Sequence, residues 1–99
     1  MEFNTALLHQ SYDRSSYHGA TVVPVYQVNA FAQESAEKLE KVFQNKAPGF
    51  AYSRISNPTV DSFERRVAAM EGGIGAVACS SGMAAVTMAL LNVLEAGDE

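Results

Sequence analysis

Apolar residues recur at helical spacing in two parts of the chain, and each part opens with a residue that favours a helix start. Ser35 is a suitable N-cap for a helix over about 36–45, and Asn57 with Pro58 opens a second helix over 58–71. The apolar positions are Ala36, Leu39, Val42 and Phe43 in the first helix and Val60, Phe63, Val67 and Met70 in the second. Each pattern predicts a helix with one buried stripe.

Charged residues and glycines support the same two helices. Glu34 and Glu37 each precede a lysine by four residues, Lys38 and Lys41, which is the favourable order for surface ion pairs on a helix. Gly72 follows the last periodic residue of the second helix, and we expect it to adopt the left-handed conformation of a C-terminal cap.

The pattern changes to almost continuous apolar sequence after residue 73. Residues 74–79 lack alternation, which predicts one strand buried on both faces. Residues 82–95 are apolar almost all round and predict a helix that needs cover on most sides. One strand cannot form a sheet by itself, so the pattern predicts an α/β segment that is incomplete as a stand-alone domain. We expect either a truncated chain or one that assembles obligatorily.

The first third of the chain has weaker periodicity. A short helix is predicted from Phe3 to His9, followed by an extended arm over 11–34. Within the arm, Val22 to Tyr26 is β-branched but contains Pro24, which cannot donate to a β-ladder. This run is therefore an edge strand or an unpaired arm.

Composition excludes several functional classes. The 99 residues are 47% apolar and 18% charged, a globular balance, and the net charge of −4 argues against nucleic-acid binding, which depends on clustered Lys and Arg. No signal peptide and no run of about 20 apolar residues is present, so we expect a cytoplasmic protein without membrane attachment. Cys79 is the only cysteine, and His9 and His18 lack metal-ligand spacing, so no disulfide and no metal site is expected.

The turn Ser80-Ser81-Gly82 between the predicted strand and helix is the first candidate site. Unpaired N–H groups and the positive end of the helix dipole converge at a helix start, which suits phosphate or carboxylate. The N–H groups of Gly82 and Met83 would point at such a ligand, and the serines can add a hydroxyl donor. A plain N-cap serine in an ordinary turn is the alternative. The turn lacks the glycine pattern of nucleotide-binding loops.

Tyr52 and Arg54 form the second candidate. A guanidinium offers a planar fork for phosphate, and a phenol adds one hydrogen bond. The residues are two apart, so in an extended segment both side chains would point the same way. A solvated surface arginine is the alternative.

Both segments together resemble the cysteine/methionine-metabolism family of pyridoxal-phosphate enzymes. The resemblance is carried by Tyr52-Ser53-Arg54 with Asn57-Pro58-Thr59, and then by Ser81-Gly82-Met83-Ala84-Ala85. It extends over nearly the whole chain, from about Phe3 to Glu99. It implies the N-terminal segment of a type I pyridoxal-phosphate transferase fold, with an arm and helix over 1–50 and the beginning of the cofactor-binding domain over 51–99.

The resemblance also implies how the site is divided. The backbone at Gly82 and Met83, often with Ser81, would bind the phosphate of pyridoxal 5'-phosphate in its own subunit. Tyr52 and Arg54 would reach the phosphate of the neighbouring subunit's cofactor. The active protein would then be a homo-oligomer, usually a dimer of dimers, acting on a small amino-acid substrate.

Catalysis in this family needs a lysine that forms a Schiff base with the cofactor. Lys38, Lys41 and Lys46 lie on a solvated helix face or its end and lack the family's lysine context. No catalytic residue is therefore assigned, and this chain alone is expected to be inactive.

Three functions remain open from the sequence. Within the family, the chain is most similar to O-acetylhomoserine sulfhydrylases, while methionine γ-lyase, cystathionine γ-lyase and cystathionine γ-synthase share these segments. A hypothesis of another class is a non-catalytic helical interaction fragment that assembles through residues 83–94. A third is a small anion-binding domain with an unrelated ligand.

Overall fold

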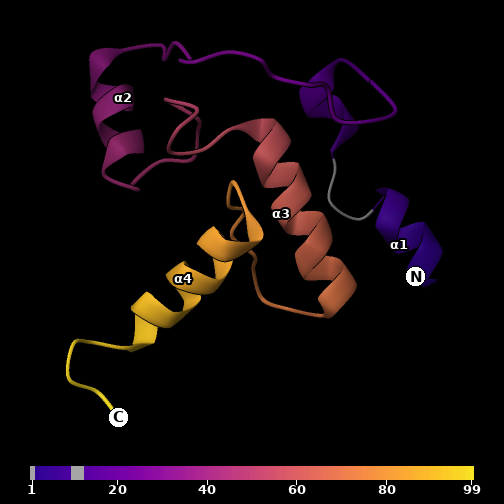
Figure 1. Ribbon diagram of the computed structural model, residues 1–99. Helices are drawn as coiled ribbons and strands as arrows, with labels where there is room; N and C mark the ends of the chain where they lie inside the picture. Colours follow the sequence, from indigo (N-terminus) through magenta and orange to yellow (C-terminus); the bar gives the residue numbers. More distant parts are fainter. Residues whose placement is uncertain (1, 10–12) are drawn as a thin grey trace.

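The computed structural model describes residues 2–9 and 13–99, which form four α-helices and one short 3₁₀ helix joined by long irregular segments (Figure 1). The elements are α1 (Phe3–His9), η1 (Arg14–Tyr17), α2 (Ala36–Phe43), α3 (Pro58–Glu71) and α4 (Gly82–Val93). The four α-helices confirm the predicted ones, although α2 and α4 each end two residues earlier than expected. The 3₁₀ helix interrupts the predicted arm, whose residues 11 and 12 lie outside the described part of the chain.

Local capping explains where three of these helices begin. Ser35, Asn57 and Ser81 all have extended backbone, and each side-chain oxygen accepts a hydrogen bond from an amide in the first turn. Helix α3 ends at Gly72, which has φ 63° and ψ 24° and so confirms the predicted left-handed cap. These are interactions between near neighbours in sequence, which is why the pattern of residues predicted them.

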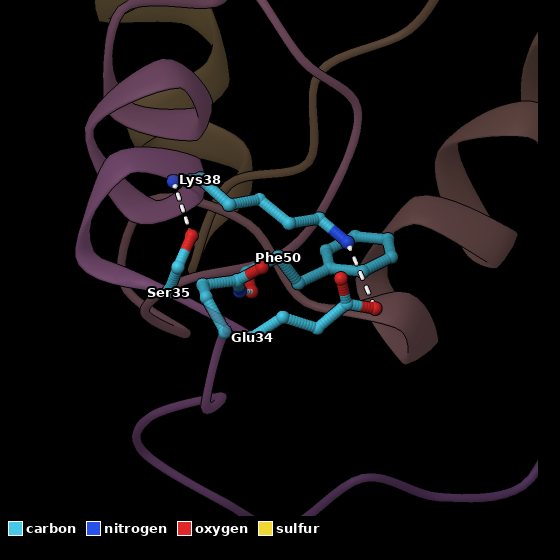
Figure 2. Close-up of polar contacts among 5 residues, drawn as sticks. Glu34, Ser35, Lys38 and Phe50 are labelled. Atoms are coloured by element: carbon cyan, nitrogen blue, oxygen red, sulfur yellow. Dashed lines mark hydrogen bonds and ion pairs between the residues drawn. The ribbon is translucent and has the colours of Figure 1, made fainter.

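Helix α2 also has the two predicted surface ion pairs. Figure 2 shows the hydrogen bond from the Lys38 amide to the Ser35 hydroxyl and the ion pair between Lys38 Nζ and the Glu34 carboxylate. The nitrogen and oxygen of this ion pair are 3.6 Å apart. On the same helix, Lys41 Nζ lies 3.0 Å from the Glu37 carboxylate. Such exposed pairs stabilise a helix by only about 0.2–0.5 kcal/mol each.

Residues 74–79 do not form the predicted strand. The only β-pairing in residues 2–9 and 13–99 is one isolated antiparallel bridge between Ala30 and Tyr52. Ile74 is fully exposed and Val77 is largely exposed. A strand requires the backbone groups of a neighbour, and no second strand lies beside this segment. The amide of Ala78 donates instead to the Glu64 carboxylate of α3, at 2.9 Å.

Little of the chain is buried, so the predicted buried stripes are also wrong for this chain. Of the residues described, only Val42, Asn57 and Pro58 are buried. The stripe of α3 is exposed at Val60, Phe63 and Met70, and α2 is exposed at Phe43. The only helices that pack together in the described chain are α1 and α3. An apolar face can be buried only if another element covers it, and most faces here have none.

The overall dimensions agree with this lack of a core. The radius of gyration is 16.4 Å, whereas a compact domain of 100 residues has a value of about 13 Å. The expectation of a segment that is incomplete by itself is therefore consistent with its shape.

The N-terminal arm forms no β-ladder over residues 22–26, and aromatic contacts run along it. Ring centroids lie 6.1 Å apart for Tyr17 and Tyr26, 6.3 Å for Tyr26 and Phe31, and 5.9 Å for Phe31 and Phe50. Partial burial, together with the neighbouring Tyr26, raises the pKa of Tyr17 above its ordinary value of 10.0. These contacts connect the arm to the loop that follows α2.

Two further observations concern the periphery. The hydroxyl and amide of Ser15 donate to the Asp13 carboxylate at the start of η1, and these hydrogen bonds hold the pKa of Asp13 below its ordinary value of 3.8. Within the described ranges, no helix combines the length and apolar character needed to cross a membrane.

Candidate functional site

Tyr52 and Arg54 lie in a tight turn rather than in an extended segment. The carbonyl of Tyr52 accepts hydrogen bonds from the amides of Ile55 and Ser56, both at 3.0 Å. The condition of the sequence-based argument for a shared direction, an extended segment, is therefore not met. The turn nevertheless brings the two side chains together, with the guanidinium carbon of Arg54 5.4 Å from the centroid of the Tyr52 ring. This is within the range of a cation–π contact.

The Arg54 guanidinium has no carboxylate partner in the described chain. The ion pairs found there belong to Lys38, Lys41 and Arg65. Arg54 is exposed, and Tyr52 remains 39% exposed beneath it. The guanidinium N–H groups and the phenol are therefore available to an anion from outside the chain.

The backbone of Tyr52 is fixed against the arm. The amide of Phe31 donates to the carbonyl of Ala51 at 3.0 Å, and the amide of Ser53 donates to the carbonyl of Asn29 at 2.8 Å. These two bonds flank the bridge between Ala30 and Tyr52, whose residues therefore form a non-hydrogen-bonded antiparallel pair. The start of the turn is held from both sides.

Asn57 and Thr59 join α3 to the arm, a role that sequence reasoning missed. The side-chain nitrogen of Asn57 donates to the carbonyl of Tyr26 and to the Ser53 hydroxyl, both at 3.0 Å. The Thr59 hydroxyl accepts from the amide of Tyr26 at 2.8 Å and donates to the carbonyl of Pro24 at 3.2 Å. A usable signal existed, because a capping asparagine uses only its oxygen and leaves two donors to be satisfied.

The second candidate lies at the start of α4. The Ser81 hydroxyl accepts from the amide of Ala84 at 3.1 Å, so it acts as the N-cap that was considered as the alternative. In the described chain, no acceptor takes the N–H of Gly82 or Met83. A Cβ built on Gly82 would meet no atom within 4 Å, so the space around this residue is open. Free donors with open space are what a helix N-terminus offers to an anion.

The structure does not bring the two candidates into one cavity. Arg54 lines a cavity of about 310 Å³ together with Asn57, Glu64 and Met88, and residues 81–83 are not part of its wall. A larger cavity of about 670 Å³ is lined by Asp13, by α3 and by residues 73–76, and its polar lining includes three carboxylates and one guanidinium: Asp13, Asp61, Glu64 and Arg65. That lining is unsuited to a phosphate because like charges repel.

The lysines and the cysteine of the described chain lie in surroundings that do not indicate a reactive site. Lys38 and Lys41 are engaged in the ion pairs of α2, and Lys46 is exposed beyond the end of that helix. Cys79 is half-buried, and its sulfur lies 3.4 Å from the sulfur of the exposed Met88. Within the described ranges, no group of three or more His, Cys, Asp or Glu side chains is arranged to hold a metal ion.

Comparison with known proteins gives a consistent result. The family model for Cys/Met metabolism PLP-dependent enzymes matches residues 4–99. The chain is 44% identical over 96 residues to an O-acetyl-L-homoserine sulfhydrylase of Corynebacterium glutamicum, which covers 97% of this chain and 22% of that protein. It is 42% identical over 97 residues to an L-methionine gamma-lyase of Pseudomonas putida, covering 98% of this chain and 24% of the lyase.

A solved structure agrees in the path of the backbone. It is that of a Campylobacter jejuni protein described as an O-acetylhomoserine (thiol)-lyase that carries N'-pyridoxyl-lysine-5'-monophosphate, and it superposes with a TM-score of 0.91 at 36% identity. The match covers 99% of this chain and 24% of that protein. The chain thus spans about a quarter of the length of the relatives it matches.

Proposed function

Because this chain belongs to the family of Cys/Met metabolism PLP-dependent enzymes, we propose that it acts as the N-terminal part of an O-acetylhomoserine sulfhydrylase. The reaction replaces the acetate leaving group of O-acetylhomoserine by sulfide and gives homocysteine. Support comes from relatives named for this activity and for homocysteine synthesis, which match almost the whole chain. The complete enzyme would be a cytoplasmic homo-oligomer.

The bound cofactor would be held by two sets of donors from this chain. Gly82 and Met83 would donate their free N–H groups to the phosphate, and the Ser81 hydroxyl, which already accepts from Ala84, can still donate its own proton. The open space at Gly82 allows the phosphate to approach the backbone closely. The donor set therefore fits an anion with several acceptor oxygens.

Tyr52 and Arg54 would bind the phosphate of the cofactor held by a neighbouring subunit. The observation that carries the proposal is that Arg54 is exposed, stacked on Tyr52 and without a carboxylate partner in the described chain. Residues 81–83 do not line the cavity that Arg54 lines, which is consistent with Arg54 binding a second cofactor. Residues 1–50 would form the arm and a helix, and residues 51–99 the beginning of the cofactor-binding domain.

The chemistry of the complete enzyme is divided between the cofactor and the protein. Pyridoxal phosphate supplies an electron sink for charge that develops on the substrate. This chain supplies binding and orientation through its N–H groups, hydroxyls and guanidinium. Its lysines at 38, 41 and 46 lie on or just beyond α2, so we assign the Schiff-base lysine to a part of the enzyme outside these 99 residues.

Residues 74–79 would complete their predicted strand in that larger context. Their apolar side chains and unpaired backbone suit a position between two neighbouring strands. The Ala78 amide, which donates to Glu64 here, would then donate to a strand.

Methionine γ-lyase is the second candidate activity. It is favoured by a match nearly equal in identity, 42% against 44% for the sulfhydrylase. Assaying the complete enzyme with O-acetylhomoserine and sulfide, and separately with methionine, distinguishes the two.

The test of the cofactor role compares two arginine variants in the full-length enzyme. Loss of charge-assisted hydrogen bonds typically costs about 1.5–3 kcal/mol, so Arg54→Ala should weaken pyridoxal-phosphate affinity by about 10- to 150-fold. Arg65→Ala is the matched control because Arg65 is exposed and paired with Asp61 at 2.9 Å. Affinity is measured by reconstituting apoenzyme and following cofactor absorbance. Normal affinity in Arg54→Ala would refute the assigned role.

A further inference from the structure

We propose that Asn57 and Thr59 are positioning residues that lock the arm at Pro24–Tyr26 onto the turn carrying Tyr52 and Arg54, and so hold Arg54 ready for the phosphate. This inference rests on the proposed function of Arg54. It assigns a role to two polar side chains that cofactor binding does not use directly.

Tyr26 is the anchoring point on the arm. Its amide donates to the Thr59 hydroxyl at 2.8 Å, and its carbonyl accepts from the Asn57 amide nitrogen at 3.0 Å. Both backbone groups of one arm residue are thus satisfied by side chains from the first turn of α3. The Thr59 hydroxyl also donates to the carbonyl of Pro24, so the contact extends along the arm.

Asn57 also closes the loop that contains Arg54. Its amide nitrogen donates to the Ser53 hydroxyl at 3.0 Å, and Ser53 in turn donates to the carbonyl of Val28. Ser53 and Asn57 bracket Arg54, so the ends of this short loop are tied to each other and to the arm. A loop fixed at both ends loses less conformational freedom when its arginine engages an anion.

Burial sets this contact apart within the described part of the chain. Asn57 is 6% exposed and, with Val42 and Pro58, makes up the buried residues of the described ranges. Buried polar groups persist when each of them is hydrogen-bonded, and Asn57 meets this condition with its oxygen on the amide of Thr59 and its nitrogen on two acceptors.

Helix capping alone does not explain these residues. The cap needs only the Asn57 side-chain oxygen, which aspartate would supply equally well. The Thr59 hydroxyl takes no part in the cap, yet it makes two hydrogen bonds to the arm. The donors of Asn57 and the hydroxyl of Thr59 therefore serve the contact between arm and turn.

The experiment measures the pyridoxal-phosphate dissociation constant of the full-length enzyme in variants that separate the two roles. Thr59→Val removes the hydroxyl at constant shape, and Asn57→Asp keeps the capping oxygen but removes both donors. Each should raise the dissociation constant by about three- to tenfold. Thr59→Ser keeps the hydroxyl and should restore normal affinity. Ser35→Ala is the control, because it removes an N-cap bond of α2 far from this loop in sequence and should leave affinity unchanged.

A double-mutant cycle with Arg54→Ala shows whether the effect passes through Arg54. If Thr59 acts by positioning Arg54, Thr59→Val should cause little further loss in the Arg54→Ala background. An additive loss, or normal affinity in both Thr59→Val and Asn57→Asp, would overturn the positioning role while leaving Arg54 as a phosphate ligand. An Arg54→Ala enzyme with normal affinity would instead overturn the proposed function of Arg54 and the positioning role together.

Discussion

Two regions of this chain differ in how far their side chains find partners within the chain. Residues 24–59 are held by polar contacts within the chain, and several of these contacts are made by Asn57, which is a buried polar residue. Residues 74–94 are strongly apolar, and the six large apolar side chains of α4 are each more than half exposed: Met83, Val86, Met88, Leu90, Leu91 and Val93. Figure 1 shows α4 extending away from the other helices toward the C-terminus.

The difference comes from the range of the forces involved. Hydrogen bonds and caps can be completed by a few residues at defined positions, so the first region contains what it needs. Burial of apolar surface requires large areas from other elements, and α4 has about 12 residues of helix with no helix packed against it in the described chain. The first region is therefore ordered by the chain itself, whereas the second would be covered only in the larger enzyme proposed above.

The largest effect is expected where the larger enzyme covers α4. Leu91 is 72% exposed in this chain, so Leu91→Lys should change stability by less than about 0.5 kcal/mol here. In the full-length enzyme the same lysine would be buried without a partner and should cost about 3–5 kcal/mol. Chemical denaturation of both proteins measures the contrast. Equally small effects in the two would mean that α4 remains exposed in the complete enzyme.

The features that sequence predicted are the local ones. Ser35, Asn57 and Gly72 take the predicted caps, and Glu34 and Glu37 take the predicted lysine partners, because each depends on residues only a few positions apart. Local propensity and spacing are enough to specify such interactions.

The features that sequence missed depend on distant partners. Residues 74–79 are apolar enough for the predicted buried strand, but they do not form it because no neighbouring strand lies within the described chain to pair with them. The contacts of Asn57 and Thr59 with Tyr26 span more than 30 residues, and no periodicity indicates them. Tyr52 and Arg54 lie together through a cation–π contact, but they are joined by a turn and not by the extended segment in which their spacing would align them.

A moderate effect is expected at the one place where the apolar region is suited to a polar ligand. In Gly82→Ala the new Cβ meets no atom of this chain within 4 Å, and helix propensity should raise stability by up to about 1 kcal/mol. The same Cβ would obstruct the phosphate, so the full-length enzyme should lose about tenfold in cofactor affinity, or about 1.4 kcal/mol. Gly75→Ala also meets no atom within 4 Å and serves as the control. Unchanged affinity in Gly82→Ala would remove this residue from the site.

The smallest effect is expected at Gly72, which ends α3 and lies between the two regions compared above. Its φ of 63° is left-handed, and a Cβ at this position would meet no atom within 4 Å, so Gly72→Ala introduces backbone strain without a clash. The cost should be about 1 kcal/mol, and Gly72→Asn should cost less because asparagine tolerates this conformation.

Gly73→Ala is the matched control for this comparison. Its Cβ would lie at an ordinary 3.6 Å from the carbonyl oxygen of Gly75, and its φ is not left-handed, so no comparable strain arises. The free energy of unfolding of the full-length enzyme, measured by denaturant titration, should fall in the order Gly72→Ala, Gly72→Asn, Gly73→Ala from the largest loss to the smallest. If the Gly72 and Gly73 variants lost equal stability, the left-handed cap would not survive in the complete enzyme, and α3 would continue into the apolar region instead of ending before it.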